Sequence, residues 1–452
     1  MKKQKLTEPF LAFNPTISIL SRNENQVQEL LVEAAKLVAP LYLQQENHSY
    51  PGANFYPHNA TRAEIEKAAK KNPEILSPDT IIERVDGKLV AIPYHVKYAT
   101  YLEPIVQKLQ QAAELTEDKE FGKRLKFQAE ALLTGQYDEA QINWMNMKPY
   151  ILDINIGPIE RYDDKLFFVK TSYQAWVGVM DQTSTARANE YKDVILNARR
   201  QALMPTEKVD YYDRVQLRVD DALVFAGLIA RTLFIGVNLP NDPNLMEKYG
   251  SEITIFKQTN DYRFKHYVWP AFNKIFSSDF KQSFTDADLK NGHLYSIILH
   301  ELAHTYLRYR NSEKNLKDLF PIIDELSANV MGLKVCGNLL IKDILGEKQL
   351  ESILLAFTAR NFNLVLEEKE DKSKYHYVVG AAIYLNYLFE TGALREAGGV
   401  YWPNFNKMFF AVSELAVTLE RMLSIGTRKD AEHFIKKYGD IEKLQRFKST
   451  FA

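Results

Sequence analysis

The feature that most constrains this chain of 452 residues is a single H-E-x-x-H motif at residues 300–304. Apolar residues recur at helical spacing around it, and no glycine or proline occurs within residues 294–310, so a helix is predicted. Residues four apart lie on one helix face, so His300 and His304 can direct their imidazoles at the same ion. Glu301 lies beside them and can act as a general base without binding the ion. The alternative is a buried helix whose histidines satisfy local hydrogen bonds.

A third metal ligand is expected from a second helical segment, which Pro321 opens at a tolerated first-turn position. Glu325 follows His304 by 21 residues, enough for one helix to end and another to return beside it. Two histidines and one glutamate form a catalytic zinc set with an open position for water, so one Zn²⁺ per chain is predicted. Asn329, one turn beyond Glu325, can accept a hydrogen bond from a ligand imidazole and so fix its tautomer. The alternative is that Asp324 and Glu325 form an ordinary solvated helix N-terminus.

Composition and charge indicate an ordinary globular protein, with 46% apolar and 25% charged residues. The formal net charge of −1 gives no reason to expect nucleic acid or a membrane as a partner. The length exceeds that of one small core, so two lobes or domains are expected. Cys336 is the only cysteine, which excludes an internal disulfide and fits a reducing compartment. No apolar stretch follows the N-terminal lysines, so a signal peptide is not expected, and the predicted location is cytoplasmic.

The local patterns mix helices and strands in the first half of the chain and are mainly helical from about residue 261. In order, they predict a helix at 23–39 that Pro40 ends or kinks, a helix at 63–71 opened by a capping box at Thr61, a hairpin at 80–90, and helical residues 98–133 broken near 116–118. Strands are expected at 150–159, 167–180 and 216–224. The apolar segment 222–237 is interrupted by Arg231 and too short to span a membrane, so a buried helix is predicted there.

Short motifs spread over most of the chain resemble the dipeptidyl peptidase III family of zinc exopeptidases, particularly the shorter modules that accompany Nudix hydrolases in some proteins. Besides the metal motifs, the resemblance rests on Phe55-Tyr56-Pro57, Ile92-Pro93-Tyr94-His95, Ala129-Glu130-Ala131-Leu132-Leu133, Ile156-Gly157-Pro158-Ile159-Glu160-Arg161-Tyr162, Asn238-Leu239-Pro240-Asn241 and Leu388-Phe389-Glu390-Thr391-Gly392. Such motifs recurring in the family's order are more specific than H-E-x-x-H alone.

The resemblance implies roles for residues outside the metal motif. It implies that Glu160 and the pair Asn238 and Asn241 bind the free amino terminus of a peptide, and that the hydroxyl of Tyr162 stabilises the oxyanion. It also implies that a histidine on a later helix, best matched by His376, assists the transition state. Taken one by one, Tyr162 can instead be an ordinary strand-end aromatic, Glu160 a solvated charge and His376 a structural histidine. The resemblance agrees with His300, His304 and Glu325 as zinc ligands and with Glu301 as the base.

Two departures from the family pattern bear on activity. Larger members carry H-E-x-x-G-H, with an extra residue between the histidines, and this chain has the shorter form. The family usually has an acidic residue where Asn329 stands, and a neutral amide there makes the imidazole a poorer donor to the metal. The chain is also much shorter than the large members.

The expected fold is therefore α+β, mostly helical, with two lobes around a cleft. Residues 1–255 would form a mixed lobe with a small β-sheet or barrel and the amino-terminus clamp, and residues 256–430 a helical zinc-binding lobe. Residues 431–452 would form a C-terminal helix that can pack back on the first lobe. The expected function is zinc-dependent release of dipeptides from the free N-termini of peptide substrates. The alternatives are a zinc endopeptidase with a specialised protein target and a catalytically weak peptide-binding relative.

Overall fold

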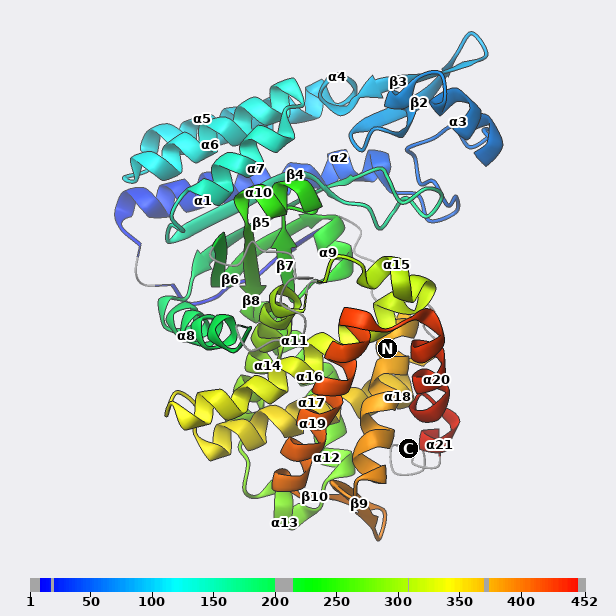
Figure 1. Ribbon diagram of the computed structural model, residues 1–452. Coiled ribbons are helices and arrows are strands. Elements are labelled where there is room, and N and C mark those ends of the chain that lie inside the picture. The colour runs from blue at the N-terminus through cyan, green and yellow to red at the C-terminus, as the bar shows by residue number, and fades with distance from the viewer. Residues whose placement is uncertain (1–8, 18–19, 200–213, 308, 370–373, 446–452) are drawn as a thin grey trace. The chain divides into compact units, whose positions relative to one another are not determined.

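The computed structural model describes residues 9–17, 20–199, 214–307, 309–369 and 374–445. The chain divides into two compact units (Figure 1). Unit 1 comprises Met1–Asp181 and Arg214–Phe256, and unit 2 comprises Gln182–Asp213 and Lys257–Ala452. Among the described helices, none is both long and apolar enough to cross a membrane. The predicted α+β class, mostly helical with one mixed and one helical part, is confirmed.

Unit 1 consists of a six-stranded sheet, helices that cover it, and a separate hairpin. The sheet order is β4-β5-β6-β8-β7, with β1 added to β6, and only the β6–β8 pair is parallel. Its strands are β1 (Phe10–Ala12), β4 (Leu152–Glu160), β5 (Ser172–Met180), β6 (Val215–Gly227), β7 (Gly236–Leu239) and β8 (Ser251–Phe256), and the hairpin is β2 (Thr80–Val85) and β3 (Lys88–Pro93). The helices are α1 (Arg22–Lys36), α2 (Val38–Gln45), α3 (Arg62–Ala69), η1 (Pro73–Leu76), α4 (Tyr94–Lys97), α5 (Ala99–Leu115), α6 (Lys119–Thr134), α7 (Tyr137–Asn146), α9 (Leu228–Thr232) and α10 (Pro243–Tyr249).

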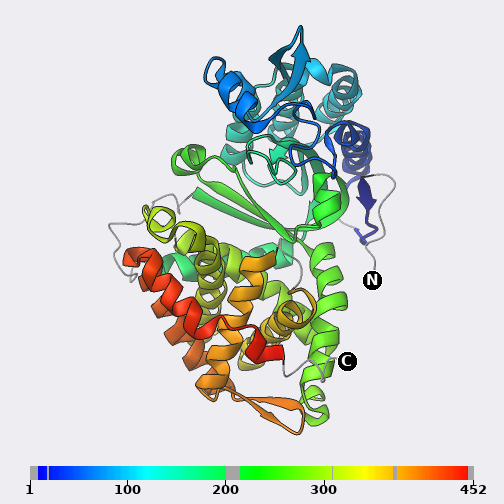
Figure 2. The same ribbon diagram turned by 90° about the vertical axis from the view of Figure 1, so that its right-hand side faces the viewer.

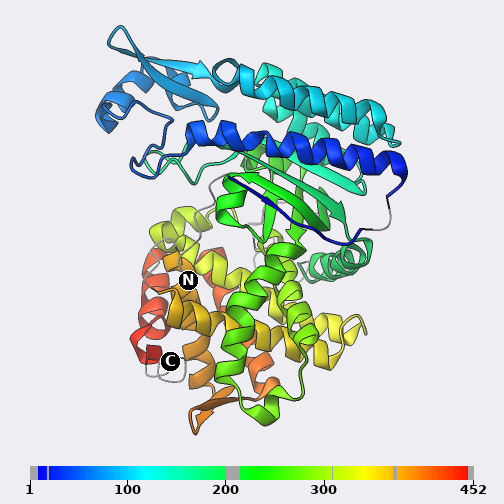
Figure 3. The same ribbon diagram turned by 180° about the vertical axis from the view of Figure 1, so that it is seen from behind.

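Buried side chains on both faces hold this sheet in place. Helices α1 and α5 lie side by side, and α1 packs on β5 and β6 (Figure 3). A second apolar cluster contains Trp176, Phe225 and Phe256, whose rings meet edge to face with centroids 4.8–5.6 Å apart. Such aromatic pairs stabilise the folded state by more than the burial of their apolar area alone would. The predicted capping box is present in part, because Thr61 Oγ1 accepts the backbone N–H of Glu64 and so begins α3.

One prediction in this region is wrong. Residues 222–237 are not one buried helix, because β6 continues to Gly227, the short α9 follows, and β7 begins at Gly236. Strand β6 lies inside the sheet with both faces covered, and such a strand has the continuous apolar run of a buried helix. The strand predicted at 150–159 is present as β4, Leu152–Glu160, and runs through the Gly157-Pro158 pair. It is an edge strand of the sheet, where a proline need not break a ladder of hydrogen bonds.

Five charged side chains are buried beside the sheet of unit 1. Arg124 contacts Asp153 at 2.5 Å, Arg218 contacts Asp220 at 2.8 Å, and Glu252 is 1% exposed. Two guanidiniums thus face three carboxylates away from water, which favours retention of a proton by one carboxylate. Burial, and next the charge of Asp153, raise the pKa of Glu252 from 4.5 to about 7.

Because the pKa of Glu252 is raised in the folded state, we expect the stability of the protein to fall as pH rises through neutrality. A carboxyl group whose pKa is raised by folding makes its full contribution to the stability of the folded state when the pH is below its pKa in the unfolded chain. That contribution is lost as the pH rises through its pKa in the folded state, here about 7. The free energy of unfolding should fall by about 1–3 kcal/mol between pH 5.5 and pH 8.5. Glu252→Gln should flatten this dependence in thermal unfolding and match or exceed the parent chain at pH 8.5. The exposed Glu139→Gln should leave the dependence intact, and an unchanged slope in Glu252→Gln would contradict the assignment.

Unit 2 is built from helices, with one small hairpin that projects from them (Figure 2). The helices are α8 (Gln182–Arg199), α11 (Lys257–Arg263), the π-helix η4 (Phe264–Val268), α12 (Trp269–Ile275), α13 (Ser278–Lys281), α14 (Asp286–Tyr306), α15 (Ser312–Leu316), η5 (Lys317–Leu319), α16 (Phe320–Ile341), α17 (Glu347–Glu367), α18 (Tyr375–Glu390), α19 (Phe405–Ile425), α20 (Arg428–Tyr438) and α21 (Glu442–Gln445). The hairpin is β9 (Leu394–Ala397) and β10 (Val400–Pro403). Helix α16 packs between α14 and α19, and α17 packs on α14.

The observed units differ from the predicted domains in two places. The main boundary falls after residue 256 rather than 255, but residues 182–213 belong to unit 2 and interrupt unit 1. The C-terminal helix also belongs to unit 2, because the side-chain amide of Asn386 on α18 donates to the carbonyls of Tyr438 and Asp440. The described part of the segment 431–452 is thus part of unit 2.

Candidate functional site

Helix α14 begins with a capping box and carries the H-E-x-x-H motif in its last two turns. Thr285 Oγ1 accepts the N–H of Asp288, and the Asp288 carboxylate accepts the N–H of Thr285. Ile298 and Leu299 are fully buried, which fixes the rotation of the helix about its axis. Helix α16 approaches closely at this level, because a Cβ on Gly332 would lie 2.8 Å from the carbonyl oxygen of Leu299. A small residue there lets the two helices meet beside the motif.

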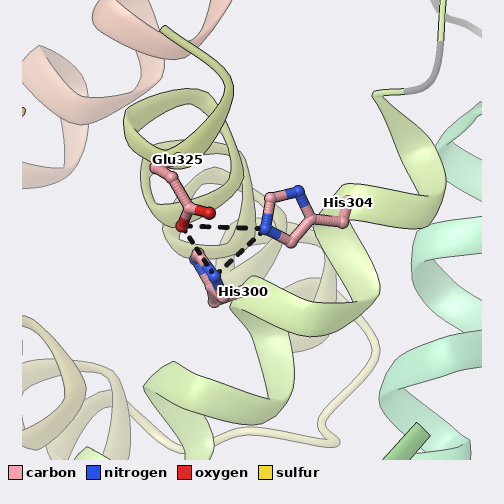
Figure 4. Close-up of side chains that lie close together, drawn as sticks. All are labelled: His300, His304 and Glu325. Atoms are coloured by element: carbon pink, nitrogen blue, oxygen red, sulfur yellow. Dashed lines mark hydrogen bonds and ion pairs between the residues drawn. The ribbon is translucent and has the colours of Figure 1, made fainter. Parts of the chain in front are cut away.

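Three side chains from α14 and α16 converge, as the spacing predicted (Figure 4). The Nε2 atoms of His300 and His304 are 3.2 Å apart. Glu325 Oε2 lies 3.4 Å from His300 Nε2 and 3.9 Å from His304 Nε2. The three residues are partly buried, and their ligand atoms all lie within 4.8 Å of one another.

These distances fit a metal ion better than hydrogen bonds. Ligands about 2.0–2.1 Å from a tetrahedral ion are separated from one another by about 3.3 Å. The two shorter separations in the triangle lie close to that value. A proton can bridge only one pair of these atoms, and a carboxylate oxygen 3.9 Å from an imidazole nitrogen is too distant for a hydrogen bond. Two nitrogens and one oxygen are also a donor set that zinc accepts in catalytic sites.

The surroundings of the His300 imidazole favour its neutral, metal-binding form. Burial, and next the neighbouring His304, lower the pKa of His300 to about 3, against smaller opposing effects of Asp324 and a hydrogen bond with Asn329. A histidine must be neutral to bind a metal. The amide nitrogen of Asn329 donates to the carbonyl of Glu325 at 2.9 Å, so its side-chain oxygen is the atom that can accept from His300.

One neighbour of the cluster was not predicted. Asp324 Oδ2 lies 3.6 Å from His304 Nδ1, the ring nitrogen that faces away from the other two ligands. A carboxylate in this place orients an imidazole and makes it a stronger donor. The sequence places Asp324 beside Glu325 but does not indicate which way either side chain points. The predicted base, Glu301, follows His300 on α14 and is partly buried.

Unit 1 brings together two of the residues that the resemblance implied for an amino-terminus clamp, Glu160 and Asn241. Glu160 ends β4, and Asn238 lies in β7, at the opposite edge of the sheet. Asn241 joins the two edges, since its side-chain nitrogen donates to the Ile159 carbonyl at 3.2 Å and it hydrogen-bonds the Glu160 carboxylate. Burial raises the pKa of Glu160, while Asn241 and the charge of Arg161 lower it. Within the described residues, the buried amide oxygen of Asn238 accepts no hydrogen bond.

Two more predicted residues have contrasting surroundings. Tyr162 is 50% exposed, and its ring contacts those of Phe168 and Phe234. His376 lies in the first turn of α18 with its ring against Tyr377, and burial lowers its pKa. Within the described part of the chain, no hydrogen bond or ion pair joins His376 to the three-residue cluster.

Comparison with known proteins decides the family. The profile described as "Peptidase family M49" matches residues 27–261, more than half of the chain. The chain belongs to this family. Membership in M49 confirms the resemblance to dipeptidyl peptidase III that the motifs indicated. The matched residues include the clamp but end before the H-E-x-x-H motif.

Individual relatives of this M49 member agree in fold. A protein named Nudix hydrolase 3 from Arabidopsis thaliana is 25% identical over 428 residues, which are 86% of this chain and 54% of the relative. The chain thus spans about half the length of that relative. The structure of DPP III from Caldithrix abyssi superposes with a TM-score of 0.85 at 23% identity, covering 97% of this chain and 95% of that one. Dipeptidyl-peptidase III from Corallococcus sp. strain EGB gives 0.74 at 22% identity, covering 97% and 93%.

Proposed function

We propose that this M49 member is a zinc-dependent metallopeptidase that releases dipeptides from the free N-termini of peptides. The observation that carries the proposal is the triangle of His300, His304 and Glu325, whose ligand atoms have the separations of a catalytic zinc set. Family membership and the likeness to two dipeptidyl peptidase III folds support the same class of reaction.

The protein's own residues would carry the proton transfers and the stabilisation of charge. Zinc held by the three ligands would lower the pKa of water toward about 7 and polarise the scissile carbonyl. Glu301 would take the proton of the attacking water and deliver it to the leaving amine. The hydroxyl of Tyr162 would donate a hydrogen bond to the oxyanion. His376 would donate a second hydrogen bond to the oxyanion.

The clamp would make the enzyme an exopeptidase. An α-ammonium has three donors, and Glu160 offers it a carboxylate while the amide oxygen of Asn238 offers an acceptor without a described hydrogen bond. Asn241 would keep the Glu160 carboxylate in place and maintain its charge. A clamp that requires a free α-ammonium would restrict the substrates to peptides with an unblocked N-terminus.

Digestion of a peptide library, with products identified by mass, tests this function. Release of two-residue fragments from free N-termini, blocked by acetylation of the substrate and by a chelator, is the expected result. Cleavage of acetylated peptides at internal bonds would instead indicate an endopeptidase. A zinc-loaded protein that cleaves no peptide would contradict the proposed activity.

We expect Tyr162→Phe to lower kcat by about a hundredfold with little change in KM. Loss of one donor to an oxyanion typically costs about 3 kcal/mol of transition-state stabilisation. The half-exposed ring remains, so its contacts with Phe168 and Phe234 should persist and folding should be unchanged. Steady-state kinetics on a dipeptidyl-arylamide measures the effect. The exposed Tyr375→Phe on α18 is the matched control, and a Tyr162→Phe enzyme with full kcat would exclude the role.

A further inference from the structure

The loop that follows β4 is held rigidly by one buried carboxylate. Asp164 is fully buried and accepts the backbone N–H groups of four residues, Leu166, Phe167, Val169 and Lys170, at 3.0–3.2 Å. The hydroxyl of Tyr56 donates to the same carboxylate at 3.1 Å. A carboxylate with this many donors fixes the backbone around it.

Further contacts tie both ends of this loop to its surroundings. The N–H of Lys165 donates to the Pro51 carbonyl at 2.7 Å, and the ammonium of Lys170 donates to the Ser77 carbonyl at 2.7 Å. Phe167 packs inward, with its ring 5.6 Å from that of Tyr56. The loop is therefore an anchored element, and the direction of each of its side chains is set.

Within this anchored loop, Phe168 is presented to solvent in a strained conformation. Its side chain is 57% exposed and its φ is +56°, a region that residues with a Cβ rarely adopt. An exposed aromatic ring gains little from folding, and the backbone under it is unfavourable. A rigid loop that keeps both features indicates that the position serves binding rather than stability.

Phe168 and Phe234 both contact the ring of Tyr162, which lies two residues after Glu160 of the clamp. The ring of Phe168 lies edge-on to Tyr162 with centroids 6.1 Å apart, and Phe234 contacts the same tyrosine at 5.5 Å. Phe234 follows Leu233, which is also held at positive φ, +52°. Tyr162 lies two residues after Glu160, and Phe234 four residues before Asn238. The rings thus come from the two chain segments that Asn241 joins in the clamp.

We infer that Phe168, with Tyr162 and Phe234, forms an apolar subsite for a large apolar side chain on one of the first two residues of the substrate. This inference rests on the proposed function, because the clamp would hold the ammonium of the same peptide. Tyr162 follows Glu160 of the clamp by only two residues, so we assign these rings to the peptide residues nearest the bound ammonium. Aromatic faces bind aliphatic and aromatic side chains by burying apolar area, so small and charged side chains at that position should be disfavoured.

Cleavage of free pentapeptides Xaa-Yaa-Ala-Ala-Ala, with Ala, Leu or Phe at each varied position, tests the subsite. The natural chain should prefer Phe or Leu over Ala at one of the two positions by about tenfold or more in kcat/KM. Phe168→Ala should reduce this preference to about twofold or less. Phe168→Tyr should restore the preference. An unaltered preference in Phe168→Ala would overturn the inference.

Two further variants separate binding from folding. Phe168→Asn removes the ring but suits a positive φ, so its midpoint of thermal unfolding should equal or exceed that of the natural chain while the preference is lost. Phe410→Ala removes an equally exposed ring from α19 of unit 2 and should alter neither property. If the natural chain cleaves no peptide, the proposed function fails. Calorimetric binding of the same peptides then still tests the subsite, and equal affinity for the Phe and Ala peptides would overturn it.

Discussion

Glu301→Gln is expected to lower kcat for peptide hydrolysis by about 10²–10⁴-fold while one zinc ion remains bound per chain. The estimate is the usual contribution of a positioned general base. Gln keeps the shape and helix propensity of Glu, so α14 and the positions of His300 and His304 should be preserved. The variant lacks only the ability to accept a proton, and substrate binding, measured as KM, should change little.

The measurement combines steady-state kinetics with metal analysis of the same preparation. Glu313→Gln, an exposed substitution on the neighbouring helix α15, is the matched control and should retain full activity. Activity within tenfold of the natural chain would exclude Glu301 as the base. Loss of zinc from Glu301→Gln would show instead that this carboxylate is needed to bind the metal.

The convergence of His300, His304 and Glu325 could be predicted because helix geometry alone determines most of it. Residues four apart on one helix face one way, so the relation of His300 to His304 needs no tertiary information. The position of Glu325 depends on tertiary packing. Its separation of 21 residues from His304 nevertheless indicated that the third ligand would come from the next helix. The contact between Asp324 and His304 was missed, because it depends on the rotation of α16, which the close approach of Gly332 to Leu299 helps to set.

The errors in the fold have a common origin in long-range structure. The apolar run at 222–237 is compatible with a buried strand or a buried helix, and only the neighbours β5 and β8 decide between them. The assignment of residues 182–213 to unit 2 likewise depends on packing, since α8 contacts α14 and α16. The strained conformation of Phe168 is set by hydrogen bonds to Asp164 that no local pattern indicates.

Glu325→Gln is expected to weaken zinc binding by about a hundredfold or more. Zinc sites with four protein ligands bind with about 10–16 kcal/mol, so one ligand contributes on the order of 3 kcal/mol. An uncharged amide oxygen is a much poorer donor than a carboxylate, and the substitution is otherwise isosteric. The triangle of ligand atoms would lose the carboxylate oxygen of Glu325, which lies 3.4 Å from His300 Nε2 and comes from a different helix than the two histidines.

Zinc titration with metal analysis and thermal unfolding measures this loss in two ways. A ligand that binds only the folded state raises its stability with concentration, so zinc should raise the unfolding midpoint of the natural chain and not that of Glu325→Gln. Asp324→Asn should lower the zinc affinity by about 10–100-fold, an intermediate result. The Asp324 carboxylate would orient His304 without contacting the ion itself. Equal zinc affinity in all three chains would exclude the cluster as the metal site. The proposed peptidase activity would then require another source for its nucleophile.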